Sequence, residues 1–259
     1  MADSIIIIGK SKVGQSLAKA IRASGRYKLS SIVSARSERF PEFESDVLIV
    51  AAKDEKISDV ARKALKQFKK KPRFIVHLAG SLESTVLPFA SGVARLTLHP
   101  IQTFPKPDAG LVKGIYWMAS SDDPAAIRWA RQFVASLGSR GIISLPKEAL
   151  PLYHTMTVFG ANFTVLLLAA IEQMSEKLGE DPKRMKSALR PLIEQALTNG
   201  LSKPAKNVIT GPIARQDYTT ISKHQRALKA LNPQIRAIYD AFLHYAEGSV
   251  IAREPRNVK

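Results

Sequence analysis

Short apolar runs of strand length alternate with amphipathic helical segments over the first 148 residues, and this alternation constrains the fold more than any other feature. Such an alternation is typical of βαβ units with a parallel sheet. Asp123 and Pro124 begin one helix with a side-chain cap and a proline at the first helical position. We therefore predict an α/β domain with strands at 4–8, 29–33, 47–52, 74–78, 95–98, 115–118 and 142–145, and with helices at 13–23, 57–68 and 124–138.

After residue 148 the pattern is helical throughout, which predicts a second, all-α domain over 149–259 following the first at 1–148. Helices are expected at 152–178, from Asp181 to about Gly200, from Asp217 or Thr219 onward, and from Asn232 to Gly248. A loop with Pro204, Gly211 and Pro212 separates them, and the 253–259 tail is expected to fray. The segment 152–178 is apolar on all sides, which predicts a buried helix.

Gly9, Ser11 and Gly14 occupy the three positions of a dinucleotide-binding fingerprint, directly after the first strand and at the start of the first helix. The first glycine allows the tight turn and the last lets helix and strand pack closely. Ser11 replaces the middle glycine, and its hydroxyl can donate to a phosphate. With Lys12 and Val13 at the helix N-terminus, this segment predicts a pyrophosphate site, although a purely structural turn has the same pattern.

The end of the second strand predicts which dinucleotide binds. An NAD site requires an acid there for the ribose 2′-hydroxyl, whereas a 2′-phosphate requires arginine and hydroxyl groups. Ser34, Arg36 and Ser37 follow the strand and no acid stands at its end, so we expect NADP(H). A solvated loop arginine is the alternative, and Glu38 is the residue that weakens the prediction.

Further polar residues follow other strands at the edge where ligands bind in open α/β sheets. Ala52 and His77 are expected at the cofactor. His99 and Gln102 lie in a polar turn between apolar elements and are expected to bind the substrate. The alternatives are a histidine that caps a loop and ordinary turn chemistry.

Several motifs resemble a short Rossmann-like oxidoreductase family of the domain-of-unknown-function type, related to pyrroline-5-carboxylate reductase, ketopantoate reductase and the deazaflavin-dependent NADP reductases. They are the fingerprint at 9–14, Val-His-Leu-Ala-Gly-Ser at 76–81, His-Pro-Ile-Gln-Thr-Phe at 99–104, Tyr153-His154 with Asn162, and Thr-Gly-Pro-Ile-Ala-Arg at 210–215. The resemblance implies a Rossmann-type domain, an NADP site, and a helical dimerisation domain of the 6-phosphogluconate dehydrogenase C-terminal kind.

His154 and Asn162 are the catalytic candidates on the long apolar helix, where polar groups require partners. At 100° per residue they are about 80° apart and share a broad face. The related dehydrogenases place a catalytic Lys or Asn on the corresponding helix, and this helix has no lysine before Lys177, which leaves His154 as the candidate acid. A buried histidine with satisfied hydrogen bonds is the alternative.

Thr210 and Arg215 are the substrate-binding candidates of the helical domain. Arg215 can hold a substrate carboxylate through two parallel hydrogen bonds. An interdomain salt bridge or a capping loop would explain the same residues.

Composition limits the remaining possibilities. The chain has no cysteine and five histidines without metal-ligand spacing, so neither a disulfide nor a metal site is expected. No positive stretch precedes the first apolar run, and the longest apolar run, 165–171, is too short to span a bilayer, so a cytoplasmic protein without a membrane segment is expected. The net charge of +17 includes a basic run at 62–73 whose one aromatic residue, Phe68, does not make the series of aromatics that stacking platforms require, so nucleic acid is not the expected partner.

Two functions remain consistent with these patterns. The first is an NADP(H)-dependent oxidoreductase that acts on a small carbonyl or imine in an interdomain cleft and works as a homodimer through the helical domain. The second is a non-catalytic Rossmann-type regulator that binds a nucleotide or another polyanion, which the serine in the fingerprint and the high positive charge favour.

Overall fold

The computed structural model describes residues 3–251, and the chain divides into two compact units, 1–161 and 162–259. Helix α4 (Leu150–Thr157) belongs to the first unit. Its residues Leu150 and Tyr153 are buried against Met118 of the sheet, and this contact joins the start of the long helix to the α/β unit. The 253–259 tail lies outside the described residues.

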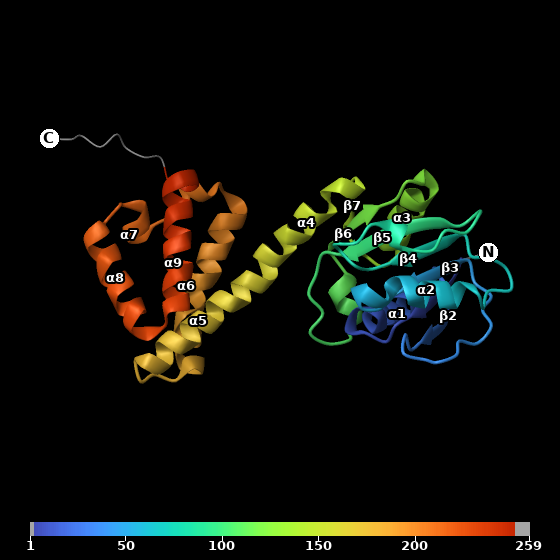
Figure 1. Cartoon of the computed structure of the whole chain (residues 1–259), viewed down its shortest axis with the longest axis horizontal. Helices are drawn as coiled ribbons and strands as arrows, with labels where there is room; N and C mark the ends of the chain where they lie inside the picture. The colour runs from blue at the N-terminus through green and yellow to red at the C-terminus, as the bar shows by residue number, and fades with distance from the viewer. Residues whose placement is uncertain (1–2, 252–259) are drawn as a thin grey trace. The chain divides into compact units, whose positions relative to one another are not determined.

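The first unit contains a seven-stranded sheet in the order β2-β1-β3-β4-β5-β6-β7. Figure 1 shows the strands of this unit in blue to green. All neighbouring strands are parallel except β5 and β6, which are antiparallel. The predicted mostly parallel sheet is therefore confirmed, with β6 and β7 running opposite to the other five strands. The strands are β1 (Ser4–Ile8), β2 (Lys28–Val33), β3 (Val47–Val50), β4 (Phe74–His77), β5 (Ala94–Pro100), β6 (Tyr116–Ser120) and β7 (Gly141–Ser144).

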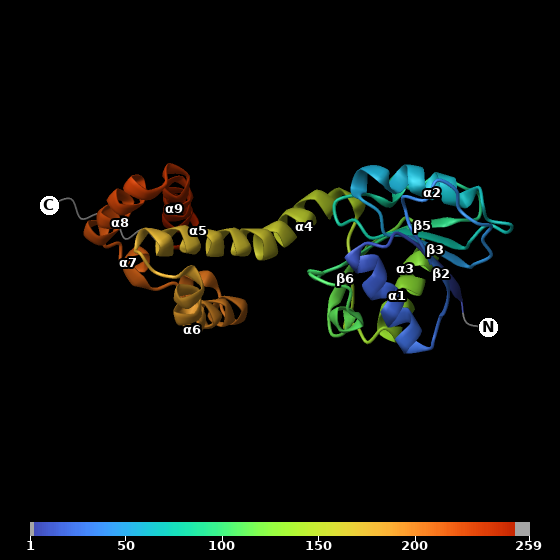
Figure 2. The ribbon, with the colours of Figure 1, turned by 90° about the horizontal axis from the view of Figure 1, so that it is seen from below.

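Helices cover both faces of the sheet because the apolar side chains of each strand alternate between the two faces. Helices α1 (Lys12–Ser24) and α3 (Pro124–Ser136) pack with Ile5 and Ile7 on one face, whereas α2 (Ile57–Leu65) packs with Ile6 and Ile8 on the other. Figure 2 shows α2 on one side of the sheet and α1 and α3 on the opposite side.

The second unit is helical, as predicted, and its helices begin at the expected caps. Asp181 caps α6 (Pro182–Ser202), Asp217 caps α8 (Tyr218–Leu231) and Asn232 caps α9 (Pro233–Tyr245). Helix α5 (Thr164–Lys177) pairs with α6, and Lys186 is hydrogen-bonded to Glu172 between them. The short helix α7 (Gly211–Ala214) lies where the sequence predicts a loop.

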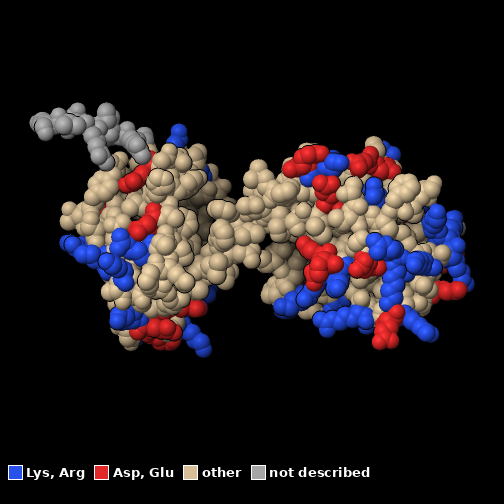
Figure 3. All heavy atoms as spheres, in the orientation of Figure 1, with Lys and Arg blue, Asp and Glu red and all other residues tan. Residues whose placement is uncertain are grey.

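The predicted helix at 152–178 is present, but the prediction that it is buried is wrong for the single chain. It continues from α4 through a π-helical stretch, Val158–Phe163, into α5. Leu152, Phe159 and Leu166 on it are each at least 60% exposed. No Asp, Glu, Lys or Arg occurs between Glu148 and Glu172, and the visible part of this helix is tan in Figure 3. Residues 3–251 therefore leave this apolar surface exposed.

Within the described residues, one helix, Lys147–Lys177, is long and apolar enough by length and composition to cross a membrane. The apolar run considered from the sequence was shorter because Thr, Tyr, His and Asn residues interrupt it. Core helices of soluble proteins meet the same criterion, so one such helix is weak evidence for a membrane.

Candidate functional site

Gly9 and Gly14 allow β1, α1 and the end of β3 to approach one another closely. Gly9 has a φ of +128°, and a Cβ there would lie 2.2 Å from the carbonyl oxygen of Ala51. A Cβ on Gly14 would lie 2.3 Å from the carbonyl oxygen of Gly9. Any larger side chain at either position would collide with the backbone, so the two glycines have the roles that a dinucleotide-binding turn requires.

Ser11 caps the first helix, and its predicted contact with a phosphate stays a prediction. Its hydroxyl donates to the Ala51 carbonyl at 3.0 Å and accepts the Gly14 amide at 3.2 Å, so it caps α1. Lys12 and Val13 are the first helical residues, whose N–H groups have no acceptor within the helix. These amides and the helix dipole fit the pyrophosphate of a dinucleotide.

Residues 34–37 form a turn after β2, with the Arg36 side chain exposed. The Ser34 hydroxyl accepts the Arg36 amide at 3.2 Å. Lys63 of α2 donates to the carbonyl of Ser37 at 2.6 Å and lies over the Phe40 ring, so a second cation reaches this turn. Lys63 was not predicted at this turn, because the basic run at 62–73 is typical of a solvated helix face.

The ends of β3 and β4 meet at the same edge of the sheet. Ala52 follows β3, and Ser81, which follows β4, donates to the Asp54 carboxylate at 3.2 Å. The strand order reverses at β1, because β2 lies on one side of β1 and β3 lies on the other. Ligands bind at such a reversal in open α/β sheets.

His77 is fully buried and its ring nitrogens are engaged within the protein. Nδ1 accepts the Ala79 amide at 3.3 Å, and Nε2 lies 3.1 Å from the Glu83 carbonyl and 3.0 Å from the Thr97 hydroxyl. Burial lowers the pKa of His77 to about 4, so the ring is neutral. This geometry favours a role in holding the loop after β4, and its predicted contact with the cofactor stays a prediction.

His99 and Tyr153 form a hydrogen-bonded pair between β5 and α4. The Tyr153 hydroxyl lies 2.6 Å from Nδ1 of His99. Burial, with a smaller contribution from His154, lowers the pKa of His99 to about 4, and burial raises the pKa of Tyr153 to about 12. Both groups are therefore neutral near pH 7. Tyr153 was expected only as part of a motif, because nothing in the sequence predicts its contact with β5.

His154 lies beside this pair with one nitrogen unsatisfied. Its ring is 6.2 Å from that of His99, centroid to centroid, and in edge contact with it. Nδ1 of His154 is buried and has no hydrogen-bond partner among residues 3–251. A buried ring nitrogen without a partner is uncommon and indicates a place for a bound water or ligand atom. The structure thus brings His99 and His154 together, with Tyr153 added.

The remaining predicted residues are Asn162, the second catalytic candidate, and the substrate-binding candidates Gln102, Thr210 and Arg215. Gln102 is exposed, and its side-chain oxygen accepts the Thr103 amide at 2.8 Å. Asn162, Thr210 and Arg215 belong to the second unit, where Asn162 and Arg215 are exposed. Their roles stay predictions.

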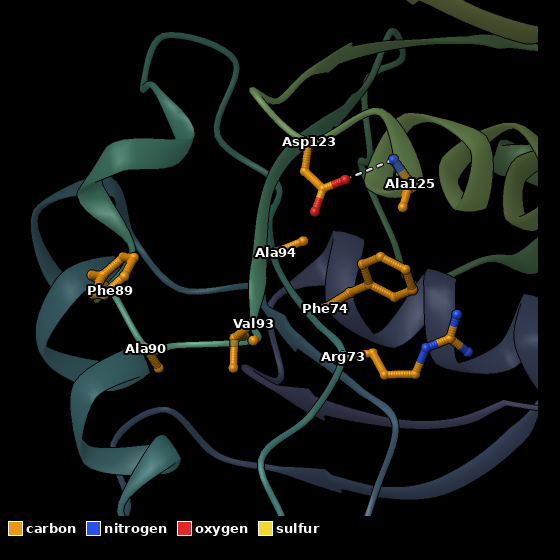
Figure 4. Close-up of a pocket in the computed structure, with 9 residues that line it drawn as sticks. Arg73, Phe74, Phe89, Ala90, Val93, Ala94, Asp123 and Ala125 are labelled. Atoms are coloured by element: carbon orange, nitrogen blue, oxygen red, sulfur yellow. Dashed lines mark hydrogen bonds between the residues drawn. The ribbon is translucent and has the colours of Figure 1, made fainter.

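An open recess of about 350 Å³ lies elsewhere, beside the amino ends of β4 and β5. Figure 4 shows Phe89 and Ala90 on one side of it and Phe74 and Arg73 on the other, with Asp123 accepting the Ala125 amide above. None of the predicted site residues lines this recess.

Solved structures of similar fold cover nearly the whole chain. A candidate NADP oxidoreductase, BF3122, from Bacteroides fragilis is 20% identical with a TM-score of 0.78, over 95% of this chain and 98% of that one. Plasmodium falciparum pyrroline carboxylate reductase with NADP bound is 13% identical, with a TM-score of 0.62 and coverage of 95% and 97%. An imine reductase from Myxococcus stipitatus in complex with NADP+ is 14% identical, with a TM-score of 0.61 and coverage of 95% for both chains. At these identities the likeness establishes the Rossmann-type fold.

No curated protein matches the sequence. One family model does, and it matches residues 115–245, from the end of the α/β unit through most of the helical unit. This confirms the resemblance found in the motifs. Because the match spans just over half of the 259 residues, the chain belongs to the family described as domain of unknown function (DUF2520).

Proposed function

We propose that the protein is an NADP(H)-dependent oxidoreductase that acts on a small carbonyl or imine compound. The observation that carries the proposal is the close approach at Gly9 and Gly14, where a Cβ would meet backbone at 2.2 and 2.3 Å. A turn that needs two glycines in this way, at the switch in strand order and at the start of a helix, is a phosphate-binding arrangement.

The choice of NADP over NAD rests on the turn after β2. Arg36 is exposed there, and Lys63 is hydrogen-bonded to the same turn. Two cations can pair with a 2′-phosphate, and no acid stands at the strand end to receive a ribose hydroxyl. The similar structures from Bacteroides, Plasmodium and Myxococcus are described with NADP, which agrees with this choice.

The reacting end of the site is assigned to His99, near the carboxyl end of β5, and His154 on α4. When bound, the cofactor supplies a hydride. Reduction of a carbonyl or imine also needs a proton at the oxygen or nitrogen, and His99 and His154 are the candidates to hold it. His154 contributes a buried nitrogen without a partner among the described residues, and Arg215 and Thr210 are proposed to hold the rest of the substrate.

We further propose a cytoplasmic homodimer. The apolar side chains exposed on α4, α5 and α6 exceed what a soluble monomer usually leaves uncovered. A second copy of the chain would cover them in a two-fold interface of ordinary size, about 800 Å² per partner. The most exposed of them are Leu152, Met156, Phe159, Val165, Leu166, Leu192 and Leu201.

Titration of the full-length protein with NADPH and NADH, followed by fluorescence, tests the cofactor. NADPH oxidation with a panel of ketones, keto acids and cyclic imines tests the reaction. Tight NADPH binding with turnover of one class supports the proposal, and absence of NADPH binding contradicts it. Binding without turnover would instead support the non-catalytic regulator, which the charge of +17 also favours.

A further inference from the structure

The direction of the hydrogen bond between Tyr153 and His99 follows from counting donors and acceptors. A phenol hydroxyl must place its one hydrogen on an acceptor when it is buried. Tyr153 is 7% exposed, and Nδ1 of His99, at 2.6 Å, is its hydrogen-bond partner among the described residues. Tyr153 therefore donates to Nδ1, and the neutral His99 ring carries its own hydrogen on Nε2.

Nε2 of His99 remains free to donate. It makes no hydrogen bond within residues 3–251, and it is not one of the two buried atoms left without a partner. The His99 side chain is partly exposed at the carboxyl end of β5. The ring thus presents an uncharged N–H donor at the edge of the sheet where the reaction is proposed to occur.

We propose that Tyr153 and His99 form a proton relay, in which His99 Nε2 gives its proton to the substrate oxygen or nitrogen while Tyr153 supplies a proton to His99 Nδ1. This inference rests on the proposed oxidoreductase function. In the step, the Nε2–H and Oη–H bonds break, and a substrate O–H or N–H bond and an Nδ1–H bond form. After product leaves, water reprotonates Nε2 and the Nδ1 proton returns to Tyr153.

A neutral imidazole is a poor acid by itself because loss of its proton leaves an imidazolate. The relay avoids that anion, since the negative charge passes to the phenol oxygen. Protonated His99 is not the donor near pH 7, because its pKa is lowered to about 4, mainly by burial and then by His154. Asp54, which raises the pKa of His99, and His77, which lowers it, are the other titratable groups acting on this ring. Tyr153, with a pKa near 12, is a weaker acid than histidinium and a stronger one than an alcohol.

Proton NMR correlated with ¹⁵N-labelled histidine rings tests the hydrogen bond in the full-length protein without any cofactor. We expect His99 to show the neutral Nε2–H form between about pH 6 and 8. Tyr153→Phe should allow the Nδ1–H form to appear, because Nδ1 then has no donor. His77 should not change and serves as the internal control. A His99 ring that carries its hydrogen on Nδ1, or that is unaffected by Tyr153→Phe, contradicts the relay.

Kinetics test the chemical role. With a substrate from the reduction panel, Tyr153→Phe should lower kcat roughly 100-fold and leave the affinity for NADPH unchanged. The kcat of the unmodified protein should stay level from about pH 6 to 8, whereas a histidinium donor would make it fall. Tyr116→Phe, at an exposed tyrosine of β6, is the matched control. A falling profile, or an unaltered kcat in Tyr153→Phe, overturns the relay alone. If the unmodified protein does not bind NADPH, the proposed function itself is wrong.

Discussion

A Cβ atom on Gly80 would lie 2.9 Å from Nδ1 of His154 and 3.1 Å from ring carbons of His99. The loop after β4 therefore sits directly against both histidines, and only a hydrogen atom fits between them. Gly80 fixes the distance between the strand end and the two rings, which come from β5 and α4.

Gly80→Ala should displace these rings. We expect it to lower the free energy of unfolding by about 1–3 kcal/mol, the usual cost of overpacking, and to reduce NADPH oxidation strongly. Urea unfolding and the reduction assay measure the two effects. Gly200→Ala is the control, because a Cβ at this helical position meets no atom within 4 Å and should be neutral or stabilising. Unchanged stability and activity in Gly80→Ala would contradict this packing.

Arg36→Ala should remove most of the preference for NADPH. One charge-assisted contact contributes roughly 1.5–3 kcal/mol, so NADPH affinity should fall about ten- to a hundredfold while NADH affinity stays nearly constant. Calorimetry with both cofactors on both proteins measures the change.

Arg26→Ala removes the same charge from a residue that precedes β2, at the opposite end of the strand, and is the matched control. Its cofactor affinities should remain those of the unmodified protein. If NADPH and NADH bind equally well before any substitution, the interpretation of Arg36 is wrong.

Most helices and strands of both units were predictable because their signals are local. The apolar runs that became β1 and β3, the glycines of the first turn, and the caps Asp123, Asp181 and Asn232 each act within a few residues. The spacing of apolar residues and the capping residues can be recognised in the sequence over such short distances. The antiparallel orientation of β6 was not predicted, since period does not specify strand direction.

The site was predictable only in part, because it depends on contacts between distant segments. The contact of Tyr153 with His99 joins residues 54 positions apart, and Lys63 reaches Ser37 across 26 positions. Likewise, nothing in the fingerprint indicates that the Ser11 hydroxyl bonds to Ala51, 40 positions later. The prediction that the long helix is buried was wrong for the single chain. An apolar composition indicates that a surface is covered, but it does not identify the molecule that covers it.

Ser11→Ala separates the capping role from a phosphate contact. The hydroxyl is bonded to Gly14 and Ala51, so its loss should lower the free energy of unfolding by roughly 1 kcal/mol and leave NADPH affinity nearly unchanged. Thermal unfolding and calorimetry measure both. A tenfold loss of NADPH affinity without loss of stability would mean that the hydroxyl contacts the phosphate after all.

Acid should destabilise the first unit through His77. Its pKa is about 4 in the folded protein and 6.5 in the unfolded chain, so between these values the unfolded chain binds more protons. The stabilisation is complete above about pH 6.5 and is lost as pH falls toward 4, by up to roughly 3 kcal/mol. His77→Gln should give a shallower decline in urea midpoint over this range. His244→Gln, at an exposed histidine, should follow the unmodified protein.

The exposed apolar surface of the long helix should make the protein a dimer, so light scattering should give about twice the chain mass of 28.4 kDa at micromolar concentration. Leu166→Asp places a charge on this surface and should shift the mass toward the monomer, because an unpaired carboxylate buried in an interface costs several kcal/mol.

Phe89→Ser is the control for the dimer, because Phe89 is 81% exposed but lies on the first unit, beside the recess at the amino ends of β4 and β5. This substitution removes an apolar side chain at least as large as Leu166 but leaves the helical surface unchanged. The mass measured by light scattering should therefore stay that of the unmodified protein. A monomer mass before any substitution would contradict the dimer. Recovery of the protein with membranes would mean that lipid, and not a second copy, covers Leu166 and its neighbours.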